Sequence, residues 1–390
     1  MKKILLSLLL LTTIKTFSQK NYQQIHADAI LIDSHNDILN ECFEKGYSFD
    51  QNLQGKTHSD LNRMLQGGID IQVFSIWCNG KKEHPFAYAN KQIDSLYAWI
   101  ARNTDKMMLV TTPKQLQQAV KQHKLGAMIG VEGGHMIENN IAYVDSLYNR
   151  GTRYMTLTWN NSTPWSTSAM EETKDSLLHQ PKGLSAYGKQ IVQRMNALGM
   201  MVDLSHVGEQ TFWDAIHTST KPVLVSHSCV YNLCPVFRNL KDDQIKAVAK
   251  SGGVIQLNFY SGFIDSNYEK RMNAIILSHK AEADSLKLAG KSEAAVAKFI
   301  QNKYKTELEA IKAPLSKLLD HLDYIVKLVG VDYVGLGSDF DGIEAPPAEL
   351  TDVTKYPLVT KGLLERGYSK KEIEKILGGN FIRVFEANSR

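Results

Sequence analysis

Short apolar runs recur along the chain, and most of them stop abruptly at charged or polar residues. The runs are continuous rather than alternating, which is typical of parallel strands covered on both faces of a sheet. The pattern therefore predicts eight strands, over residues 29–37, 67–77, 126–135, 153–159, 200–206, 222–227, 253–260 and 331–339.

Segments with a helical spacing of apolar residues lie between these strands. They cover residues 88–109, 141–149, 185–198 and a stretch from about residue 210. Strands that alternate with helices predict an α/β fold, and eight parallel strands are the number that closes a (β/α)8 TIM-type barrel. A doubly wound open sheet is the alternative, but no strand is followed by the glycine-rich turn that binds dinucleotides in such sheets.

One long interruption separates the last two predicted strands. Residues 262–315 are rich in Lys, Glu and Ala, which favours a helical insertion. Such a segment serves either as a lid over a site or as a solvated decoration, and we favour decoration. No linker or repeat marks a second domain, so residues 19–390 are predicted to form a single domain.

Residues 1–18 have the pattern of a secretory signal peptide. Two lysines precede an apolar run over residues 4–11, and small residues follow before a predicted cleavage near Ser18. The apolar run is too short for a permanent membrane span. No cysteine follows it closely and no apolar tail ends the chain, so no lipid or C-terminal membrane anchor is expected. We therefore expect an exported soluble protein, periplasmic or secreted.

Composition narrows the class of protein further. The 390 residues are 43% hydrophobic and 22% charged, with a formal net charge of +4, which is ordinary for a soluble globular protein. No basic patch suggests binding to nucleic acid or to an anionic membrane. The four cysteines, at positions 42, 78, 229 and 234, include no Cys-x-x-Cys pair, so we expect buried free thiols rather than a disulfide scaffold.

Side chains that bind metals recur at the carboxyl ends of the predicted strands. They are His35, Asp37, Glu132, His206, His227 and Asp339. A single histidine at such a position is more often part of a core or loop, but these six residues come from five strand ends. Because the carboxyl ends of barrel strands meet on one face, where barrel active sites lie, the pattern predicts a shared metal site.

The donor set favours zinc, with manganese or cobalt as substitutes, because it holds imidazoles and carboxylates but no thiolate. Its members exceed the needs of one ion, so we expect two ions bridged by Glu132, with a bridging water as nucleophile. His35 and Asp37 would hold one ion, and His206 and His227 the other. Asp339 is left as the general base and acid.

Other residues of the same types lack this context. His58 and Asp60 repeat the His-x-Asp spacing without an apolar strand before them, and Thr57 or Ser59 there resembles a helix N-cap. Asp341 is expected to shape a turn. His135 is expected to lie behind the metal ligands, and His321 to pack on the helix before the last strand.

At these motifs the chain resembles the renal (membrane) dipeptidase family. The resemblance runs in order from about Ala29 to Phe385, through residues 32–37, 130–135, 203–206, 226–228, 238–240, 337–342 and 379–385. It implies a hydrolase barrel with two zinc ions that cleaves dipeptides, tolerates a D-residue on the C-terminal side, and in some members opens β-lactams. It also implies the ligand roles given above, Arg238 as the group that binds the dipeptide carboxylate, and a homodimer. Without the resemblance, we would expect Arg238 to form a salt bridge at the surface.

One position departs from the family. Where the family often has a histidine that contacts substrate, this chain has Trp159, which offers only an N–H donor and cannot change protonation state. Help to the oxyanion would then come from a metal, Asn160 or Asn161. Two alternatives therefore stay open: another barrel metallohydrolase, acting on a cyclic amide, lactone or β-lactam, and a metal-dependent binding protein without catalysis.

Overall fold

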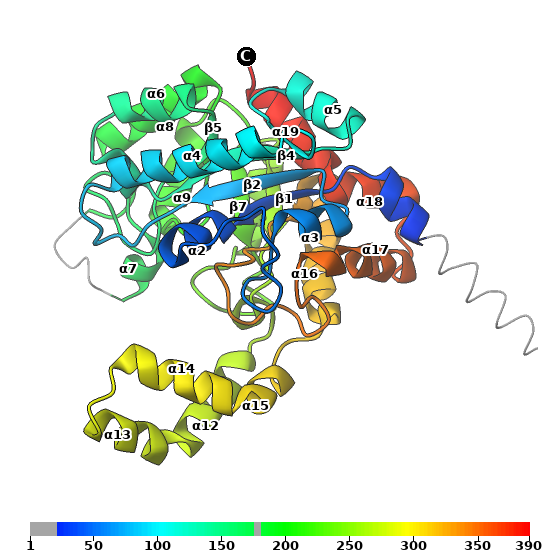
Figure 1. Cartoon of the computed structure of the whole chain (residues 1–390). Helices are drawn as coiled ribbons and strands as arrows, with labels where there is room; N and C mark the ends of the chain where they lie inside the picture. The colour runs from blue at the N-terminus through cyan, green and yellow to red at the C-terminus, as the bar shows by residue number, and fades with distance from the viewer. Residues whose placement is uncertain (1–21, 175–180) are drawn as a thin grey trace, which may run out of the picture.

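The strands form one parallel sheet that closes into a barrel (Figure 1). The computed structural model describes residues 22–174 and 181–390. Eight strands follow one another in the order β1-β2-β4-β5-β6-β7-β8-β9, and a parallel bridge between Asn36 and Phe340 joins the two ends of this order. The strands are β1 (Ile32–Asn36), β2 (Ile71–Ile76), β4 (Leu125–Glu132), β5 (Thr152–Thr156), β6 (Met201–Asp203), β7 (Leu224–Ser228), β8 (Val254–Leu257) and β9 (Val334–Leu336). The predicted TIM-type barrel is confirmed.

Helices surround the barrel in the alternation that the sequence predicted. They are α2 (Ile38–Lys45), α3 (Leu61–Gln66), α4 (Pro85–Arg102), α5 (Pro113–Lys121), α6 (Ala142–Asn149), α7 (Ala169–Thr173), α8 (Ala186–Leu198), α9 (Glu209–Thr218), α10 (Asp242–Lys250), α16 (Leu315–Val329), α17 (Tyr356–Glu365), α18 (Lys370–Glu374) and α19 (Asn380–Asn388). The segments predicted at 141–149, 185–198 and from about 210 correspond to α6, α8 and α9.

The prediction of one helix over residues 88–109 was wrong at its end. Helix α4 stops at Arg102, and the side chain of Asn103 donates a hydrogen bond back to the carbonyl of Trp99 (2.8 Å). The apolar residues that follow form a short additional strand, β3 (Met107–Leu109), which pairs with β4 outside the main strand order. A short apolar run beside a helix reads as helix in sequence, and only pairing with β4 makes it a strand.

Side chains alternate along the strands between two apolar cores. Val73, Met128 and Tyr154 belong to a cluster to which seven barrel strands contribute and which fills the barrel, whereas Phe74 and Met155 join the larger core under the surrounding helices. This alternation is the normal packing of a barrel of eight strands. The first cluster is closed at one end by Phe381, Val384 and Phe385 of α19. The opposite, carboxyl end of the strands is left for polar side chains.

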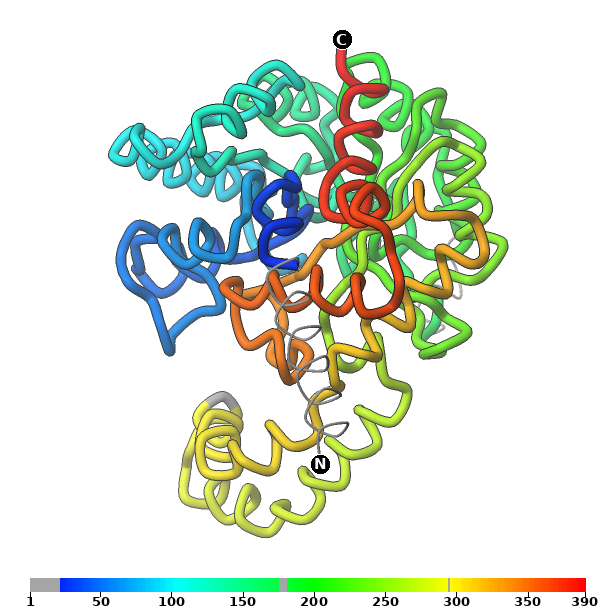
Figure 2. Tube along the Cα trace, turned by 90° about the vertical axis from the view of Figure 1, so that its right-hand side faces the viewer, coloured from blue at the N-terminus to red at the C-terminus, as the bar shows by residue number. Residues whose placement is uncertain are grey.

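The insertion between β8 and α16 is helical, as predicted. It consists of α11 (Ser261–Ile264), α12 (Tyr268–Ser278), α13 (Lys280–Leu288), α14 (Glu293–Lys303) and α15 (Lys305–Ala310). Figures 1 and 2 show α12–α15 projecting from the barrel on the side away from α19. Because α11 begins soon after the carboxyl end of β8, the insertion leaves the barrel at the end that carries the polar side chains. Its role as decoration or lid stays a prediction.

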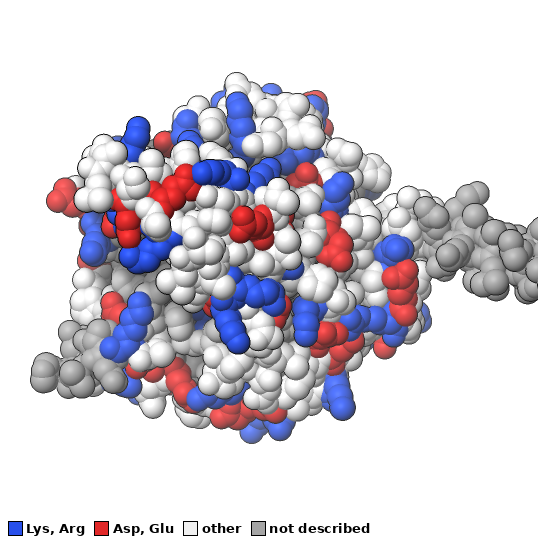
Figure 3. All heavy atoms as spheres, turned by 90° about the horizontal axis from the view of Figure 1, so that it is seen from below, with Lys and Arg blue, Asp and Glu red and all other residues white. Residues whose placement is uncertain are grey.

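Several expectations concern the surface and the N-terminus. All four cysteines are buried free thiols, as expected. None of the helices in the described ranges is long and apolar enough to cross a membrane. On the face seen from below, basic and acidic side chains are interspersed (Figure 3). The predicted signal peptide, residues 1–18, lies outside the described residues. The boundary between it and a single domain over residues 19–390 stays a prediction.

The packing of α19 against the barrel interior gives a stability prediction. Phe385→Ala should lower the free energy of unfolding by about 3–5 kcal/mol, because it leaves a cavity where a fully buried ring closes the cluster. Equilibrium urea denaturation measures the change. Glu386→Ala, at the exposed neighbouring position, is the control and should change stability by less than about 0.5 kcal/mol. Equal effects of the two substitutions would contradict this role of α19.

Candidate metal centre

The six side chains predicted as metal ligands or proton acceptor lie together at the carboxyl end of the barrel. They come from β1 (His35), the residue after β1 (Asp37), the end of β4 (Glu132), the turn after β6 (His206), β7 (His227) and the turn after β9 (Asp339). All six are buried or nearly so. Five separate chain segments thus bring polar groups to one point, which is the arrangement that a barrel gives its strand ends.

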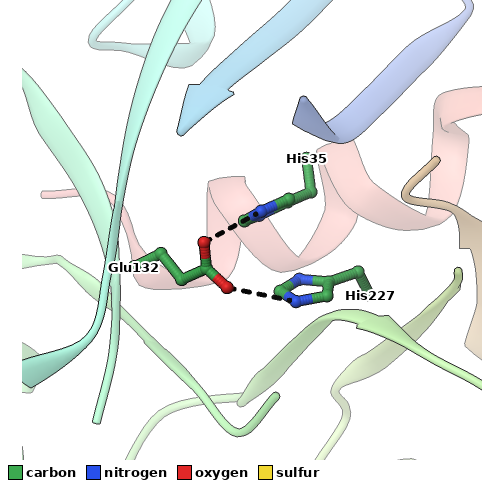
Figure 4. A group of neighbouring side chains, drawn as sticks. All are labelled: His35, Glu132 and His227. Atoms are coloured by element: carbon green, nitrogen blue, oxygen red, sulfur yellow. Dashed lines mark ion pairs between the residues drawn. The ribbon is translucent and has the colours of Figure 1, made fainter. Parts of the chain in front are cut away.

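Glu132 points its carboxylate toward both His35 and His227 (Figure 4). Its Oε2 atom is 3.5 Å from Nε2 of His35. Its other oxygen, Oε1, is 2.8 Å from Nε2 of His206 and 3.5 Å from Nε2 of His227. Each carboxylate oxygen therefore faces a different histidine or histidine pair.

A second set of donors surrounds His35. Its Nε2 atom is 3.6 Å from Oδ2 of Asp37 and 3.9 Å from Oδ1 of Asp339. The ligand atoms of His35, Asp37 and Asp339 are close enough together to hold one ion, as are those of His35, Glu132 and His227. Asp339, predicted as the proton carrier, thus also lies within reach of an ion held by Asp37.

Hydrogen bonds behind the histidines fix which ring nitrogen faces the centre. The Tyr154 hydroxyl donates to the carbonyl of Ser34 (3.1 Å), so toward Nδ1 of His35 (2.8 Å) it acts as the acceptor. Nδ1 of His206 lies 3.0 Å from the side-chain oxygen of Asn160, which can only accept. In their neutral form both rings therefore carry their proton on Nδ1 and turn the lone pair of Nε2 toward Glu132.

His227 is held in the same way. The Ser226 hydroxyl donates to Oδ2 of Asp203 (2.6 Å) and lies 2.8 Å from Nδ1 of His227, from which it accepts. All three histidines thus have the tautomer that binds a metal through Nε2, and each is oriented by a partner on its other nitrogen. Such outer partners are a regular feature of metal sites.

The ionisation states fit a cation at this point. Burial lowers the pKa of His206 to about 4, with the nearby charge of Arg238 acting in the same direction, so its imidazole is neutral and able to ligate. Burial acts to raise the pKa of Glu132, but positive charge at His35 and the close contacts with His206 and His227 outweigh it, so the pKa lies well below the usual range. A metal cation held by these histidines would act in the same direction. Burial raises the pKa of Asp339 well above its usual range, and the carboxylates of Asp37 and Glu132 add to this effect.

Two ligand atoms in the group have no hydrogen-bond partner although they are fully buried. They are Nε2 of His35 and Oδ1 of Asp37. A buried polar atom without a partner is costly, and a metal ion would satisfy both. The donor set of imidazoles and carboxylates suits zinc. The residues present therefore fit the metal centre that the sequence predicted.

Backbone strain is concentrated at the same point. His206 and Asp339 both have left-handed backbone angles (φ 63° and 61°), which non-glycine residues rarely adopt. Gly342 passes so close to the site that a Cβ atom there would collide with the carboxylates of Asp37 and Asp339. Strained residues held in this way are typical of functional sites.

Arg238 lies beside the histidines, almost completely buried. Its guanidinium donates to Oγ of Ser228 (3.2 Å) and to the carbonyl of His227 (3.1 Å), and its Nε–H has no hydrogen-bond partner. A cavity of about 320 Å³ is lined by Arg238, His206, Tyr231 and Phe237 among others. A buried cation with a free donor beside a cavity can bind an anion. Arg238 is therefore not part of a surface salt bridge, which was the alternative.

The other residues predicted to contact substrate lie on the His206 side of the centre. The half-buried Trp159 ring packs edge-on against Trp77 (ring centroids 5.0 Å apart) and lies 6.5 Å from the ring of His206. The oxygen of the Asn160 side chain accepts the hydrogen bond from His206. The structure thus shows a supporting contact for Asn160, and contact of either residue with substrate stays a prediction.

The sequence did not indicate some side chains that contact the candidate metal ligands. Tyr154, Ser226 and Asn258 touch the ligands or Asp339, and nothing in the sequence separates them from other buried polar residues. Asp203 had a signal, because it stands at a strand end three residues before His206.

The residues set aside in the sequence have structural partners. Nε2 of His135 contacts the carbonyl of Cys78 (3.0 Å), behind the ligands. His321 packs within the core and accepts from the amide of Val230 (3.0 Å). The N-cap of α3 is Asp60, whose side chain accepts from the amide of Arg63, so the expectation of Thr57 or Ser59 as the cap was wrong.

Known proteins resemble nearly the whole chain. The profile of the membrane dipeptidase family, peptidase family M19, matches residues 19–390. The chain is 30% identical to an uncharacterized dipeptidase of Schizosaccharomyces pombe over 95% of its own length and 83% of the relative's. It is also 30% identical to dipeptidase 3 of Mus musculus, over 92% of its length but only 64% of that longer protein.

Solved structures share the fold. A probable dipeptidase from Pseudomonas aeruginosa superposes with a TM-score of 0.78 at 23% identity, covering 96% of this chain and 98% of that one. A metallopeptidase from Rhodobacter sphaeroides, liganded with a phosphinate mimic of the dipeptide L-Ala-D-Ala, gives a TM-score of 0.74 at 21% identity, covering 92% and 99%. The family match over nearly the whole chain, together with the donor set at the barrel end, shows that the protein belongs to the membrane dipeptidase family, peptidase family M19, and is a metal-dependent hydrolase.

Proposed function

We propose that this protein is a zinc dipeptidase that cleaves the peptide bond of dipeptides, including those with a D-residue on the C-terminal side. The proposal rests mainly on the position of the Glu132 carboxylate. One of its oxygens faces His35, and the other faces His206 and His227. The mimic of L-Ala-D-Ala bound to the Rhodobacter sphaeroides neighbour supports the stereochemical part. Two zinc ions at this centre would supply an acidified water and polarise the carbonyl of the scissile bond.

The side chains divide the remaining work. Arg238 binds the free carboxylate of the dipeptide through its unpaired Nε–H and the guanidinium fork. Asp339 takes a proton from the attacking water and passes it to the leaving amine. Its Oδ2 accepts a hydrogen bond from Asn258 (2.8 Å), which leaves Oδ1 on the side of His35.

Export and assembly belong to the same proposal. The family match starts at residue 19, directly after the predicted signal peptide, which supports an exported, periplasmic or secreted, mature chain. A dipeptide is the expected substrate, and binding to nucleic acid is not expected. A homodimer stays a prediction from the family resemblance.

A panel of substrates tests the function directly. The metal-loaded protein should hydrolyse L,L- and L,D-dipeptides, and metal analysis should find about two zinc ions per chain. No turnover of any dipeptide, with turnover of a lactone, cyclic amide or β-lactam, would assign the protein to another branch of barrel metallohydrolases. If calorimetry detects dipeptide binding but no dipeptide is cleaved over a day, the protein is a metal-dependent binding protein without catalysis.

Asp339→Asn separates proton transfer from metal binding. The amide is nearly isosteric but cannot accept the proton, so kcat should fall about 10²–10⁴-fold while both metals and the KM for dipeptide are retained. Metal analysis and steady-state kinetics measure the two effects. Loss of metal together with activity would make Asp339 a ligand only, and wild-type kcat with both metals bound would place the base elsewhere.

Arg238→Ala should act on binding. We expect KM for dipeptides with a free C-terminal carboxylate to rise about 10–100-fold, because a charge-assisted hydrogen bond contributes about 1.5–3 kcal/mol. The matched control is the corresponding dipeptide amide, whose KM should change little. A similar rise for acid and amide would mean that the substitution disturbs the site generally and that Arg238 does not read the carboxylate.

A further inference from the structure

The loop after β9, residues 337–342, carries Asp339 in a strained conformation. Asp339 and Asp341 both have left-handed backbone angles (φ 61° and 67°). Residues in this conformation persist only where contacts from the surrounding structure hold them. The Asp339 loop therefore needs contacts at both ends to keep the Asp339 carboxyl in place.

The first end of the Asp339 loop is held by the barrel itself. The amide of Asp339 donates to the carbonyl of His35 (3.0 Å), and the side chain of Asn258 donates to Oδ2 of Asp339 (2.8 Å). A bond within the loop joins the amide of Gly342 to the carbonyl of Asp339 (3.1 Å). These bonds fix Asp339 and close the turn around Asp341, but none of them reaches the amide or the side chain of Asp341 itself.

The second end is held by His58, from a loop far away in sequence. The amide of His58 donates to Oδ1 of Asp341 (2.6 Å), and the amide of Asp341 donates to Nδ1 of His58 (3.2 Å). The His58 ring also lies against Phe340, with ring centroids 5.3 Å apart. The two residues thus form a reciprocal pair of hydrogen bonds. In each bond the backbone amide of one residue donates to the side chain of the other.

The loop that carries His58 is itself fixed. The carbonyl of His58 accepts hydrogen bonds from the guanidinium of Arg63 (3.1 Å) and from the amide of Val353 (3.2 Å). The side chain of Asn36, the last residue of β1, donates to Oγ of Ser59 (2.9 Å). Figures 1 and 2 show this segment, before α3, beside the chain that follows β9. His58 therefore links the Asp339 loop to a rigid support outside the barrel.

We propose that His58 is a positioning residue for Asp339, which it holds through the amide of Asp341. The inference rests on the proton-transfer role of Asp339 in the proposed function. The hydrogen bond to Nδ1 fixes Asp341 in its left-handed conformation, and Asp341 fixes the turn through which Gly342 passes close to Asp37 and Asp339. Without it, the Asp339 carboxyl would sample positions away from the reacting groups, and a displacement of about 1 Å can cost up to 10²-fold in rate.

Three substitutions separate the acceptor atom from the ring. The side-chain oxygen of Asn can occupy the place of Nδ1, whereas that of Gln falls closer to the place of Nε2. His58→Ala and His58→Gln should lower kcat about 10-fold or more with KM changed less than about 2-fold, and His58→Asn should restore most of kcat. Zinc content and the thermal midpoint show whether each variant is folded and loaded.

A second measurement does not depend on activity. Amide hydrogen exchange of the peptide that spans residues 336–343 should be faster by about 5-fold or more in His58→Ala and His58→Gln than in wild type and His58→Asn, because the loss of a hydrogen bond lowers the cost of opening by about 1 kcal/mol. Slow exchange in all variants would overturn the proposal, and so would equal losses of kcat in all three. If wild type cleaves no dipeptide, the proposed function fails, and the exchange comparison still decides whether His58 holds the loop.

Discussion

The buried carboxylate of Glu132 imposes a constraint that the rest of the site satisfies. It lies at the mouth of the barrel with Asp37 and Asp339 nearby, so negative charge is gathered in a place with little water. Such a cluster is costly unless cations occupy it. Three imidazoles turn their Nε2 atoms toward Glu132, and bound metal would complete the compensation. The imidazoles can compensate this charge only if Nε2 faces Glu132. Hydroxyl groups behind the rings, such as those of Tyr154 and Ser226, hold the histidines in that orientation.

The barrel makes this concentration of polar groups possible by separating the two ends of its interior. One end is filled with apolar side chains and closed by α19, and the opposite end receives the ligands. Tyr154 links the two, because its ring packs in the apolar cluster while its hydroxyl reaches Ser34 and His35. Stability and chemistry are therefore supported by the same strands, with their residues divided along the barrel axis.

The insertion α12–α15 stands apart from this arrangement. It has few buried side chains of its own, and Ile276, Leu277, Leu288 and Phe299 are exposed on it. It leaves the barrel at the site-bearing end, through α11, whose Phe263 ring lies 5.4 Å from the guanidinium carbon of Arg238. The base of the insertion therefore touches the site, whereas its outer helices do not share the barrel core.

The sequence by itself determined the barrel and indicated which side chains meet at its carboxyl end. Both signals are local, because continuous apolar runs mark parallel strands, and a run that stops at His35 or Asp339 marks the end that faces the site. The tertiary structure decided three further matters, since each depends on residues far apart in the chain. Residues 107–109 became strand β3 only because the first residues of β4, before those that pair with β5, accept them. Asn160 pairs with His206, and His58 pairs with Asp341 across 283 positions, because folding brings their loops together. No spacing in one segment records such a contact, since a side-chain hydrogen bond depends on the position of both partners in space.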